Sequence, residues 1–339
     1  MESFAFWYKK KGNHNKKNQV AATMNFNLWS QCNWDEAPYL DIGFKIKNLE
    51  SAEELYFFLP FCIKEAEKTK YIEDLGCKFK HTELVDAVFN ESYATTIAAN
   101  KKTIKVETIE KTSAFGETEK FYIYQLDIEH DIKLEQFADG TIITIKTDDI
   151  INSVYKDDEN NKKNVFYLRF RIKNLTLDSL IHKYQAPRSA LQSLFNATYM
   201  IDFRFHNIRS LDKTLIEKFD GIDTKVVGIE ALHFLLMTKA YIDVSNKDFK
   251  SIRKIEQGVW KDYVNGNDTE DLLAYHFADK VKKSGSGEAP AFLTSSEFFA
   301  KFRVEKTVFY KYLAFTLGMG VLGSIIGSFV IEVIKKLFF

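Results

Sequence analysis

The sequence predicts a mainly β body of the α+β class, followed by a helical C-terminal portion and one C-terminal transmembrane helix. Many short segments alternate apolar and polar residues with a period of two, as strands do. Phenylalanine (30) and tyrosine (16) are abundant, and aromatic residues favour strands. No charged residue interrupts 312–331. We therefore divide the chain into a β-rich cytosolic body (1–245), a helical segment (246–283), a linker (284–305) and a transmembrane anchor (306–339).

The N-terminal part predicts a β-hairpin. Residues 4–8 are aromatic, residues 9–18 are polar, and residues 20–29 alternate with a period of two. Further strands are predicted at 40–46, 55–61, 103–109, 121–128, 141–146, 166–172, 199–205 and 232–244. Short helices are predicted at 83–89 and 190–195.

One sequence pattern occurs three times. Residues 42–49 (IGFKIKNL) are repeated as 168–175 (LRFRIKNL), and 201–208 (IDFRFHNI) is a weaker third copy. Each copy is an alternating strand that ends near an asparagine, a residue that closes strands by bonding nearby backbone. The copies indicate either duplicated sheet units or convergence on a common strand pattern.

The region after residue 245 has a different character. Apolar residues recur at helical spacing within 247–264 and again within 268–283, so both segments are predicted as helices. Residues 284–287, Ser-Gly-Ser-Gly, then predict a flexible linker.

Composition and motifs exclude several function classes. Lys+Arg and Asp+Glu both total 47, which argues against non-specific binding of nucleic acid. Cys32, Cys62 and Cys77 are too widely spaced for a zinc site, and we expect free buried thiols. Fingerprint motifs of hydrolases, nucleotide-binding loops and zinc proteases are absent, so we expect no enzyme, metal or cofactor.

Carboxylates and arginines on predicted strands are the candidate ligand groups. Asp127, Glu129 and Asp131 share one strand face and suit either a divalent metal or, more simply, solvent. Arginine and lysine side chains that share a strand face would form a cationic surface for phosphates if their strands are neighbours. The alternative is a solvated sheet face. The candidate residues for an anion or oligonucleotide are Arg169, Arg171, Lys173, Arg204 and Arg209.

The C-terminal segment predicts a single membrane span. Residues 312–331 would form a helix about 30 Å long, the thickness of a bilayer core. Basic residues are more numerous on the side of the body, which places the body in the cytoplasm under the positive-inside rule. No signal peptide is visible at the N-terminus. We therefore expect a single-pass protein of the inner (cytoplasmic) membrane.

The span carries small and polar residues that favour contact between helices. Small residues let helix backbones approach closely, and a carboxylate at the end of a span could line a pore mouth. We therefore expect a homo-oligomer. The alternative is that Gly and Ser are merely tolerated and that the carboxylate reaches the headgroups. The candidate packing and pore residues are Thr316, Gly320, Gly323, Ser324, Gly327, Ser328 and Glu332.

This layout resembles the transmembrane effectors of prokaryotic anti-phage defence that oligonucleotides control, of the cyclic-oligonucleotide-gated or Hailong type. The resemblance rests on the whole-chain architecture and on the Gly/Ser-rich span 318–328. It implies a cytosolic sensor, an oligomeric channel that depolarises the membrane and arrests the infected cell, and a partner nucleotidyltransferase that makes the oligonucleotide. A tail-anchored scaffold and a membrane-tethered hydrolase are the alternatives.

Overall fold

The computed structural model describes residues 2–12, 19–30, 37–89, 92–98, 101–109, 119–154, 164–184, 196–245, 248–264, 271–281, 292–305 and 309–338. The chain divides into two units. The larger, which we call the body, comprises Met1–His182 and Met200–Phe302, and the smaller comprises Lys183–Tyr199 and Arg303–Phe339. The body is mainly β, as predicted, and the smaller unit contains the long C-terminal helix.

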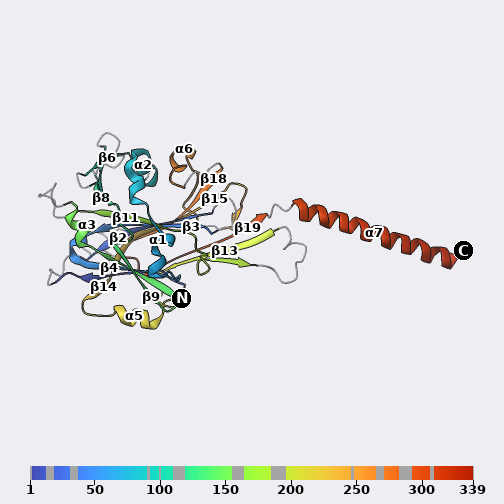
Figure 1. Ribbon diagram of the computed structural model, residues 1–339, viewed down its shortest axis with the longest axis horizontal. Helices are drawn as coiled ribbons and strands as arrows, with labels where there is room; N and C mark the ends of the chain where they lie inside the picture. Colours follow the sequence, from blue (N-terminus) through green and yellow to red (C-terminus); the bar gives the residue numbers. More distant parts are fainter. Residues whose placement is uncertain are drawn as a thin grey trace. The chain divides into compact units, whose positions relative to one another are not determined.

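Ten of the described strands form the central sheet (Figure 1). Its order is β17-β18-β15-β2-β3-β11-β8-β7-β6, and β5 pairs with β11. The strands are β2 (Ala21–Trp29), β3 (Tyr39–Lys47), β5 (Ile72–Asp74), β6 (Tyr93–Ile97), β7 (Thr103–Thr108), β8 (Lys120–Tyr124), β11 (Phe166–Ile172), β15 (Gly228–Lys239), β17 (Ser251–Lys254) and β18 (Leu272–Lys280).

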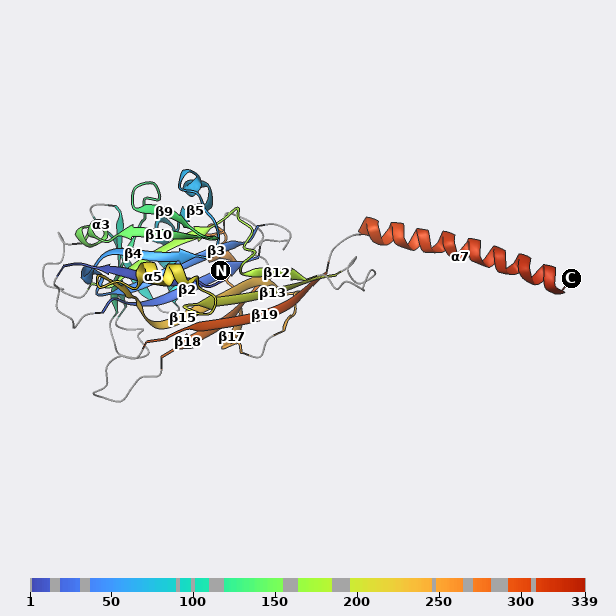
Figure 2. The ribbon, with the colours of Figure 1, turned by 90° about the horizontal axis from the view of Figure 1, so that it is seen from below.

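Two smaller sheets complete the strand structure (Figure 2). The five-stranded sheet has the order β14 (Thr224–Val226), β1 (Ala5–Lys10), β4 (Ala52–Leu59), β10 (Gly140–Lys146) and β9 (Ile132–Phe137). The four-stranded sheet has the order β12 (Ile181–Tyr184), β13 (Asn196–Phe205), β19 (Ser296–Glu305) and β16 (Val244–Ser245).

The helices are short except for the last. The described helices are η1 (Leu49–Ser51), η2 (Glu65–Glu67), α1 (Lys68–Tyr71), η3 (Gly76–Lys80), α2 (Thr82–Phe89), α3 (Asp148–Asn152), α5 (Lys213–Phe219), α6 (Gln257–Trp260) and α7 (Phe309–Phe338). The predicted helix at 83–89 is confirmed as α2, and the one at 190–195 lies outside the described residues.

One face of the central sheet is apolar and holds the main core. Alternate residues of β2, β3, β15 and β18 point to this face, as the period of a strand requires. Phe44 packs against Phe6 and Phe57 of the five-stranded sheet, with ring centroids 5.1 Å apart in each pair. Phe26 packs against Phe203 of the four-stranded sheet at 4.7 Å. Both smaller sheets therefore cover the same face.

Helices cover the outer layers of the body. In Figure 1, α2 and α6 lie side by side over the opposite face of the central sheet, and buried Val85 and Trp260 pack there against Trp29. On the far side, α5 covers the five-stranded sheet through Phe219, which stacks on Trp7 at 4.6 Å.

The repeated pattern found in the sequence has a structural counterpart. Strands β3 and β11, which contain the two closest copies, are antiparallel neighbours in the central sheet. Asn48 (φ 57°) and Asn174 (φ 56°) end these copies in the left-handed region, and His206 (φ 51°) does so in the third. Asn tolerates this region better than most residues, which explains its position after the strands.

The predicted N-terminal hairpin is wrong. Strand β1 pairs with β4 and β14, whereas β2 pairs with β3 and β15 in a different sheet. Residues Ala5–Tyr8 are buried in succession, which shows that both faces of β1 are covered. A partner strand also lies at each edge of β1. Alternation of apolar and polar residues predicts that β1 and β2 are strands, but it does not predict which strands they pair with.

The predicted helical segment 246–283 is also wrong. It contains strands β17 and β18, and its only described helix is the single turn α6. Strand β18 is covered on both faces, so Leu272, Tyr275 and Phe277 are all buried and imitate helical spacing. The predicted linker 284–305 is wrong at its end, because Ser296–Glu305 forms β19. Residues 284–287 lie outside the described residues.

Candidate functional site

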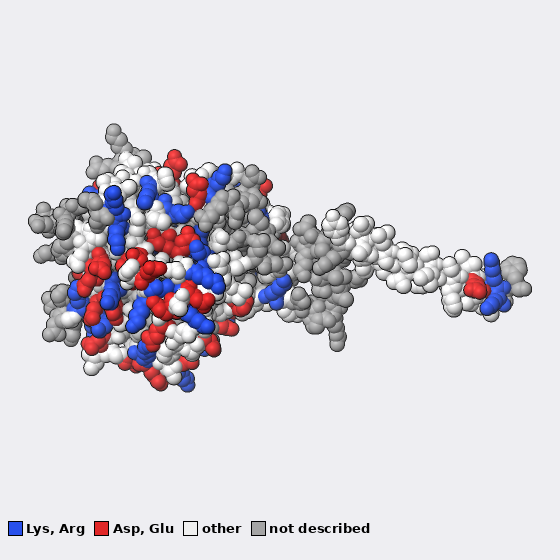
Figure 3. Space-filling model, in the orientation of Figure 1, with Lys and Arg blue, Asp and Glu red and all other residues white. Residues whose placement is uncertain are grey.

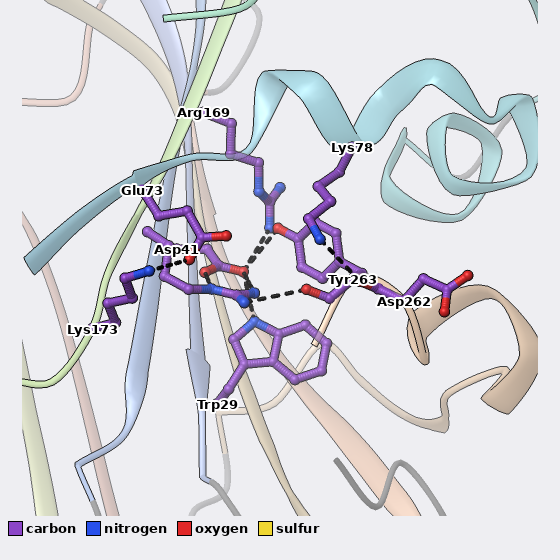
Figure 4. Close-up of polar contacts among 9 residues, drawn as sticks. Trp29, Asp41, Glu73, Lys78, Arg169, Lys173, Asp262 and Tyr263 are labelled. Carbon is purple, nitrogen blue, oxygen red and sulfur yellow. Dashed lines mark hydrogen bonds and ion pairs between the residues drawn. The ribbon is translucent and has the colours of Figure 1, made fainter. Parts of the chain in front are cut away.

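The second face of the central sheet is polar beneath α2 and α6. The strand register places Asn27 beside Asp41, and Asp41 beside Arg171, all on this face. Arg169 lies on the same face, two residues along β11. Figure 4 shows how Arg169, Trp29 and Tyr263 converge on Asp41. Most residues here are fully buried, so each polar atom needs a partner.

Asp41 is the centre of this buried network. It accepts hydrogen bonds from Nε of Arg171 (2.6 Å) and from a second guanidinium nitrogen (3.1 Å). Its Oδ2 also accepts from Nε1 of Trp29 at 2.7 Å and from the hydroxyl of Tyr263 at 2.8 Å. Arg169 approaches the same oxygen at 3.6 Å. Two cations thus share one carboxylate, and the three side chains have a net charge of +1.

The charges keep Asp41 ionised despite its burial. Burial alone would raise the pKa of this carboxyl, but Arg171 and Arg169 hold the pKa below its ordinary value. Burial raises the pKa values of Tyr167 and Tyr263, so both phenols stay neutral. The Tyr263 hydroxyl donates to Asp41, and the Tyr167 hydroxyl accepts from Nη1 of Arg169. The network is therefore a fixed ionic structure at neutral pH.

The cationic surface predicted on β11 is wrong, because Arg169 and Arg171 are both buried. Their half-buried neighbour Lys173 forms an ion pair with Glu73 at 2.7 Å. Reversing Arg169 and Arg171 to Glu would bury three acidic groups together with Asp41 among them, so the body should not tolerate this change as a solvated surface would. When a strand is buried on both faces, alternation of polar and apolar residues does not mean that its polar face is exposed to solvent.

The other two predicted residues belong to a different region. Arg204 is on β13, in the four-stranded sheet, and forms ion pairs with Asp202 and Glu2. Arg209 is exposed in the turn that follows β13. Strands β11 and β13 are therefore not neighbours, and the five predicted residues do not form one surface.

An open cleft continues the polar face beyond the buried network. We call it the polar cleft. It has a volume of about 510 Å³, in the range of small-molecule sites. The lining comes from the end of α2, the residue directly before β8 and strands β2, β3, β15, β17 and β18. It consists of Thr23, Asn25, Lys45, Lys47, Val88, Phe89, Glu119, Glu230, His233, Leu235, Ser251, Arg253, His276 and Lys280.

A histidine pair lies in the polar cleft. Nδ1 of His233 and Nε2 of His276 are 2.9 Å apart, so one ring donates a hydrogen bond to the other. Burial, followed by Lys280 and His276, lowers the pKa of His233 to about 4. Burial, Arg253 and Lys280 also lower the pKa of His276. Both rings are therefore neutral at pH 7.

A smaller cavity adjoins the polar cleft and reaches the buried network. It measures about 30 Å³ and shares Asn25, Val88, Leu235 and Arg253 with the lining of the cleft. Arg169 also lines it. Within the described residues, Nε of Arg169 is one of three buried side-chain atoms without a hydrogen-bond partner. The ionic network thus borders the cavity with an unused donor.

Among the described residues, no group of three or more His, Cys, Asp or Glu side chains could hold a metal ion. Asp127, Glu129 and Asp131 lie in a turn and not on a strand, where Asp127 caps the backbone N–H of Glu129 at 3.0 Å. Asp131 accepts from the backbone of Asp127 at 2.8 Å. Cys62 and Cys77 are free but exposed, which corrects the prediction of buried thiols. Cys32 lies outside the described residues.

The helix α7 has the properties of a membrane span. The most apolar 18 residues within Tyr312–Leu337 have a mean hydropathy of 2.0, and none of that stretch is buried among the described residues. Figure 3 shows Lys/Arg and Asp/Glu intermingled over the body, whereas the described surface of α7 is uncharged until the group near its C-terminal end. An added Cβ at Gly320, Gly323 or Gly327 would meet no atom within 4 Å.

The polar cleft was missed by the sequence analysis because its residues come from seven separate segments. His233 and His276 lie 43 residues apart, and each sits in an apolar stretch. The available signal was a histidine on each of two strands whose other residues are apolar. No protein-family model matches the chain, and no curated protein is similar to it in sequence.

Proposed function

We propose that the protein is a ligand-controlled membrane effector without catalytic activity. Its body senses a signal, which we propose to be an oligonucleotide made by a partner nucleotidyltransferase. Its α7 helices assemble in the cytoplasmic membrane into a pore that depolarises the cell, in the manner of an anti-phage defence effector. The observation that carries the proposal is the 26-residue apolar helix Tyr312–Leu337, whose most apolar stretch is not buried by any of the described residues.

Lipid is the solvent that suits α7. A helix this apolar would be unstable in water unless protein covered it, and a span of about 20 residues matches the bilayer core. Lys335 and Lys336 in its last turn can reach the headgroups. The basic residues before the span favour a cytoplasmic body.

Assembly through α7 is supported by its small residues. Gly320, Ser324 and Ser328 recur every four positions and follow one face of the helix. A Cβ added at Gly320 would meet no atom of the described residues within 4 Å, so this face has room for another helix. Glu332, near the end of the span, would then face a shared mouth and favour cations.

Control by a ligand is supported by the polar cleft. Its volume and its mixture of cationic, imidazole and amide groups suit a small polar ligand. A scaffold that only localises a partner has no use for such a cleft. A hydrolase would use it for catalysis, and is the second alternative.

The experiment is expression in bacteria with measurement of growth and membrane potential. Replacing 312–331 with an unrelated Leu-rich helix of equal length should abolish depolarisation while the protein stays in the membrane. A scaffold or a hydrolase would keep its effect in that variant, and full toxicity there would refute the pore.

Single substitutions test the assembly face. Gly320→Leu and Ser324→Leu should insert normally, since Leu is more apolar, yet should reduce cross-linked oligomer and toxicity. Ile326→Leu is the matched control, because it conserves volume and apolar character on the same helix. Oligomer yields equal to wild type in both test variants would leave α7 as a simple tether.

A further inference from the structure

Strand β6 forms one edge of the central sheet (Figure 1). Within the described residues, β7 is its only partner strand, and the two strands run antiparallel. The sequence of β6, YATTI, has no charged residue and consists largely of residues that favour strands. An edge of this kind is open to pairing with a further strand.

Two hydrogen bonds just beyond the ends of β6 fix which of its backbone groups bond β7. The N–H of Ala98 donates to the carbonyl of Thr103 at 2.8 Å. The N–H of Ile109 donates to the carbonyl of Ser92 at 3.2 Å. Hydrogen-bonded pairs alternate along an antiparallel ladder, so the even-numbered residues of β6 bond β7. The N–H and C=O groups of the odd-numbered residues therefore point to the open edge.

Helix α2 holds β6 in place and closes the start of the open edge. Oδ1 of Asp86 accepts a hydrogen bond from the N–H of Tyr93 at 2.8 Å, so the first outward N–H is occupied. The hydroxyls of Thr82 and Thr95 are 2.9 Å apart and form a second link. Among the described residues, the outward N–H and C=O groups of Thr95 and Ile97 form no hydrogen bond. Four backbone groups are thus available on a strand whose position is fixed.

The other described edges of the three sheets are protected against strand addition. A lysine or arginine on an edge strand opposes pairing with a further strand, and so does a very short strand. Strands β9, β12, β14 and β17 each contain a lysine or an arginine, and β16 has only two residues. Among the described edges, β6 alone combines five residues with the absence of charge.

We infer that β6 pairs with β6 of a second copy of the chain, so that the central sheets of two bodies become continuous. The two strands run antiparallel about a twofold axis at Thr96. Thr95 of each copy then exchanges both backbone bonds with Ile97 of the other copy, which gives four hydrogen bonds. A twofold axis at Thr95 would instead need the N–H of Tyr93, which Asp86 already occupies.

The side chains of β6 suit the pairing of two identical strands. Thr96 of one copy lies opposite Thr96 of the other on the exposed face, where two threonines can bond each other. On the second face, Ile97, which is 50% exposed, lies beside Thr95 of the other copy. Because β6 carries no charge, a second copy brings no like charges together.

Membrane anchoring favours a second copy as the partner. Four hydrogen bonds would not hold two free proteins together, because association costs translational and rotational freedom. Anchoring by α7 confines all copies to one surface and raises their effective concentration. The inference rests on the proposed function for this confinement alone. It adds a contact between bodies to the proposed contact between α7 helices.

Disulfide cross-linking of the full-length protein in bacterial membranes tests the inference. Residues opposite each other in a non-hydrogen-bonded pair have Cα atoms about 4.5 Å apart, within reach of a disulfide. Thr96→Cys should therefore give a disulfide-linked dimer under mild oxidation. Ala94→Cys is the matched control, because it is exposed on the same face but would lie about 14 Å from its counterpart. The wild type, with exposed Cys62 and Cys77, gives the background.

Hydrogen exchange of the same full-length protein tests the pairing without a new thiol. The N–H groups of Thr95 and Ile97 should be protected in the wild type, because each bonds the second copy. Thr96→Glu should remove this protection, since two carboxylates then meet at the twofold axis. Ala94→Lys is the control, because its new charges do not meet. Within one copy the new groups lie opposite Lys105 and Glu107 respectively, so both variants should fold.

Three results would overturn the inference. They are a dimer yield for Thr96→Cys no higher than for Ala94→Cys, a cross-link from Thr96→Cys to a different protein, and exchange of the two amides as fast in the wild type as in Thr96→Glu. Each is measured without reference to toxicity. Depolarisation without the β6 contact would leave the proposed function standing, and the β6 contact without depolarisation would leave this inference standing.

Discussion

The two buried arginines make different predictions for stability, although they share one carboxylate. We consider the substitutions Arg171→Met and Arg169→Met, which conserve an unbranched apolar stem. Arg171 makes both close bonds to Asp41, at 2.6 and 3.1 Å, whereas Arg169 approaches it only at 3.6 Å. The network also has one cation more than it has anions. The two arginines should therefore contribute unequally to the free energy of unfolding.

The expected magnitudes follow from what each substitution leaves behind. Without Arg171, Asp41 loses its bidentate partner in a fully buried site, and breaking such a pair costs about 3–5 kcal/mol. Without Arg169, Asp41 keeps Arg171 and the network becomes neutral. The loss is then the bond to Tyr167 at 2.9 Å, worth about 1 kcal/mol, and it is partly offset by removal of an unpartnered Nε–H.

The assay is urea unfolding of the full-length protein in detergent, followed by tryptophan fluorescence. Trp29 donates to Asp41 and reports directly on the network. We expect Arg171→Met to lower the free energy of unfolding by at least about 2 kcal/mol more than Arg169→Met, which is roughly thirtyfold in the unfolding equilibrium. Equal losses would show that net charge does not govern this site and would refute the reasoning.

Two further predictions concern pH and packing. His206 and His233 have folded-state pKa values of about 4 because burial disfavours the charged ring, against an ordinary value of 6.5. The unfolded chain binds these protons more readily than the folded protein does. The free energy of unfolding should therefore be retained above pH 6.5 and fall as pH drops from 6.5 to 4. An unfolding midpoint that stays constant from pH 7 to 4.5 would contradict this. Gly43→Ala would place a Cβ 2.4 Å from the Tyr167 hydroxyl and should lower the free energy of unfolding by about 1–3 kcal/mol. Gly258→Ala, where an added Cβ meets no atom within 4 Å, is the control, and equal melting temperatures for the two variants would disprove the clash.

Strands and the membrane helix were predictable because their signals are local. Alternation within eight or so residues predicted β3, β7, β10 and β11, and uncharged length predicted α7. Local signals failed where a strand is covered on both sides. In β18 the buried residues do not alternate with a period of two. Their spacing therefore matched a helix better than a strand, and the sequence analysis predicted a helix there.

The candidate site could not be predicted in the same way, because its contacts are distant in sequence. Asp41 and Arg171 are 130 residues apart, and Tyr263 is 222 residues from Asp41. One local signal did exist. Asp41 and Arg169 each have large apolar residues directly before and after them, which is typical of strands buried on both faces. That signal predicts burial and a partner, but not which partner.

The alignment of β3 and β11 has a consequence for pairing between molecules. The two strands are nearly repeats of one sequence, so β11 of one copy could pair with β11 of another during folding at high concentration. Their correct register places Asp41 opposite Arg171 and the small Gly43 opposite Arg169. An antiparallel pair of two β11 strands in the corresponding register would set arginine against arginine, and like charges opposite each other destabilise a sheet. The departures from the repeat therefore make strand exchange between copies unfavourable.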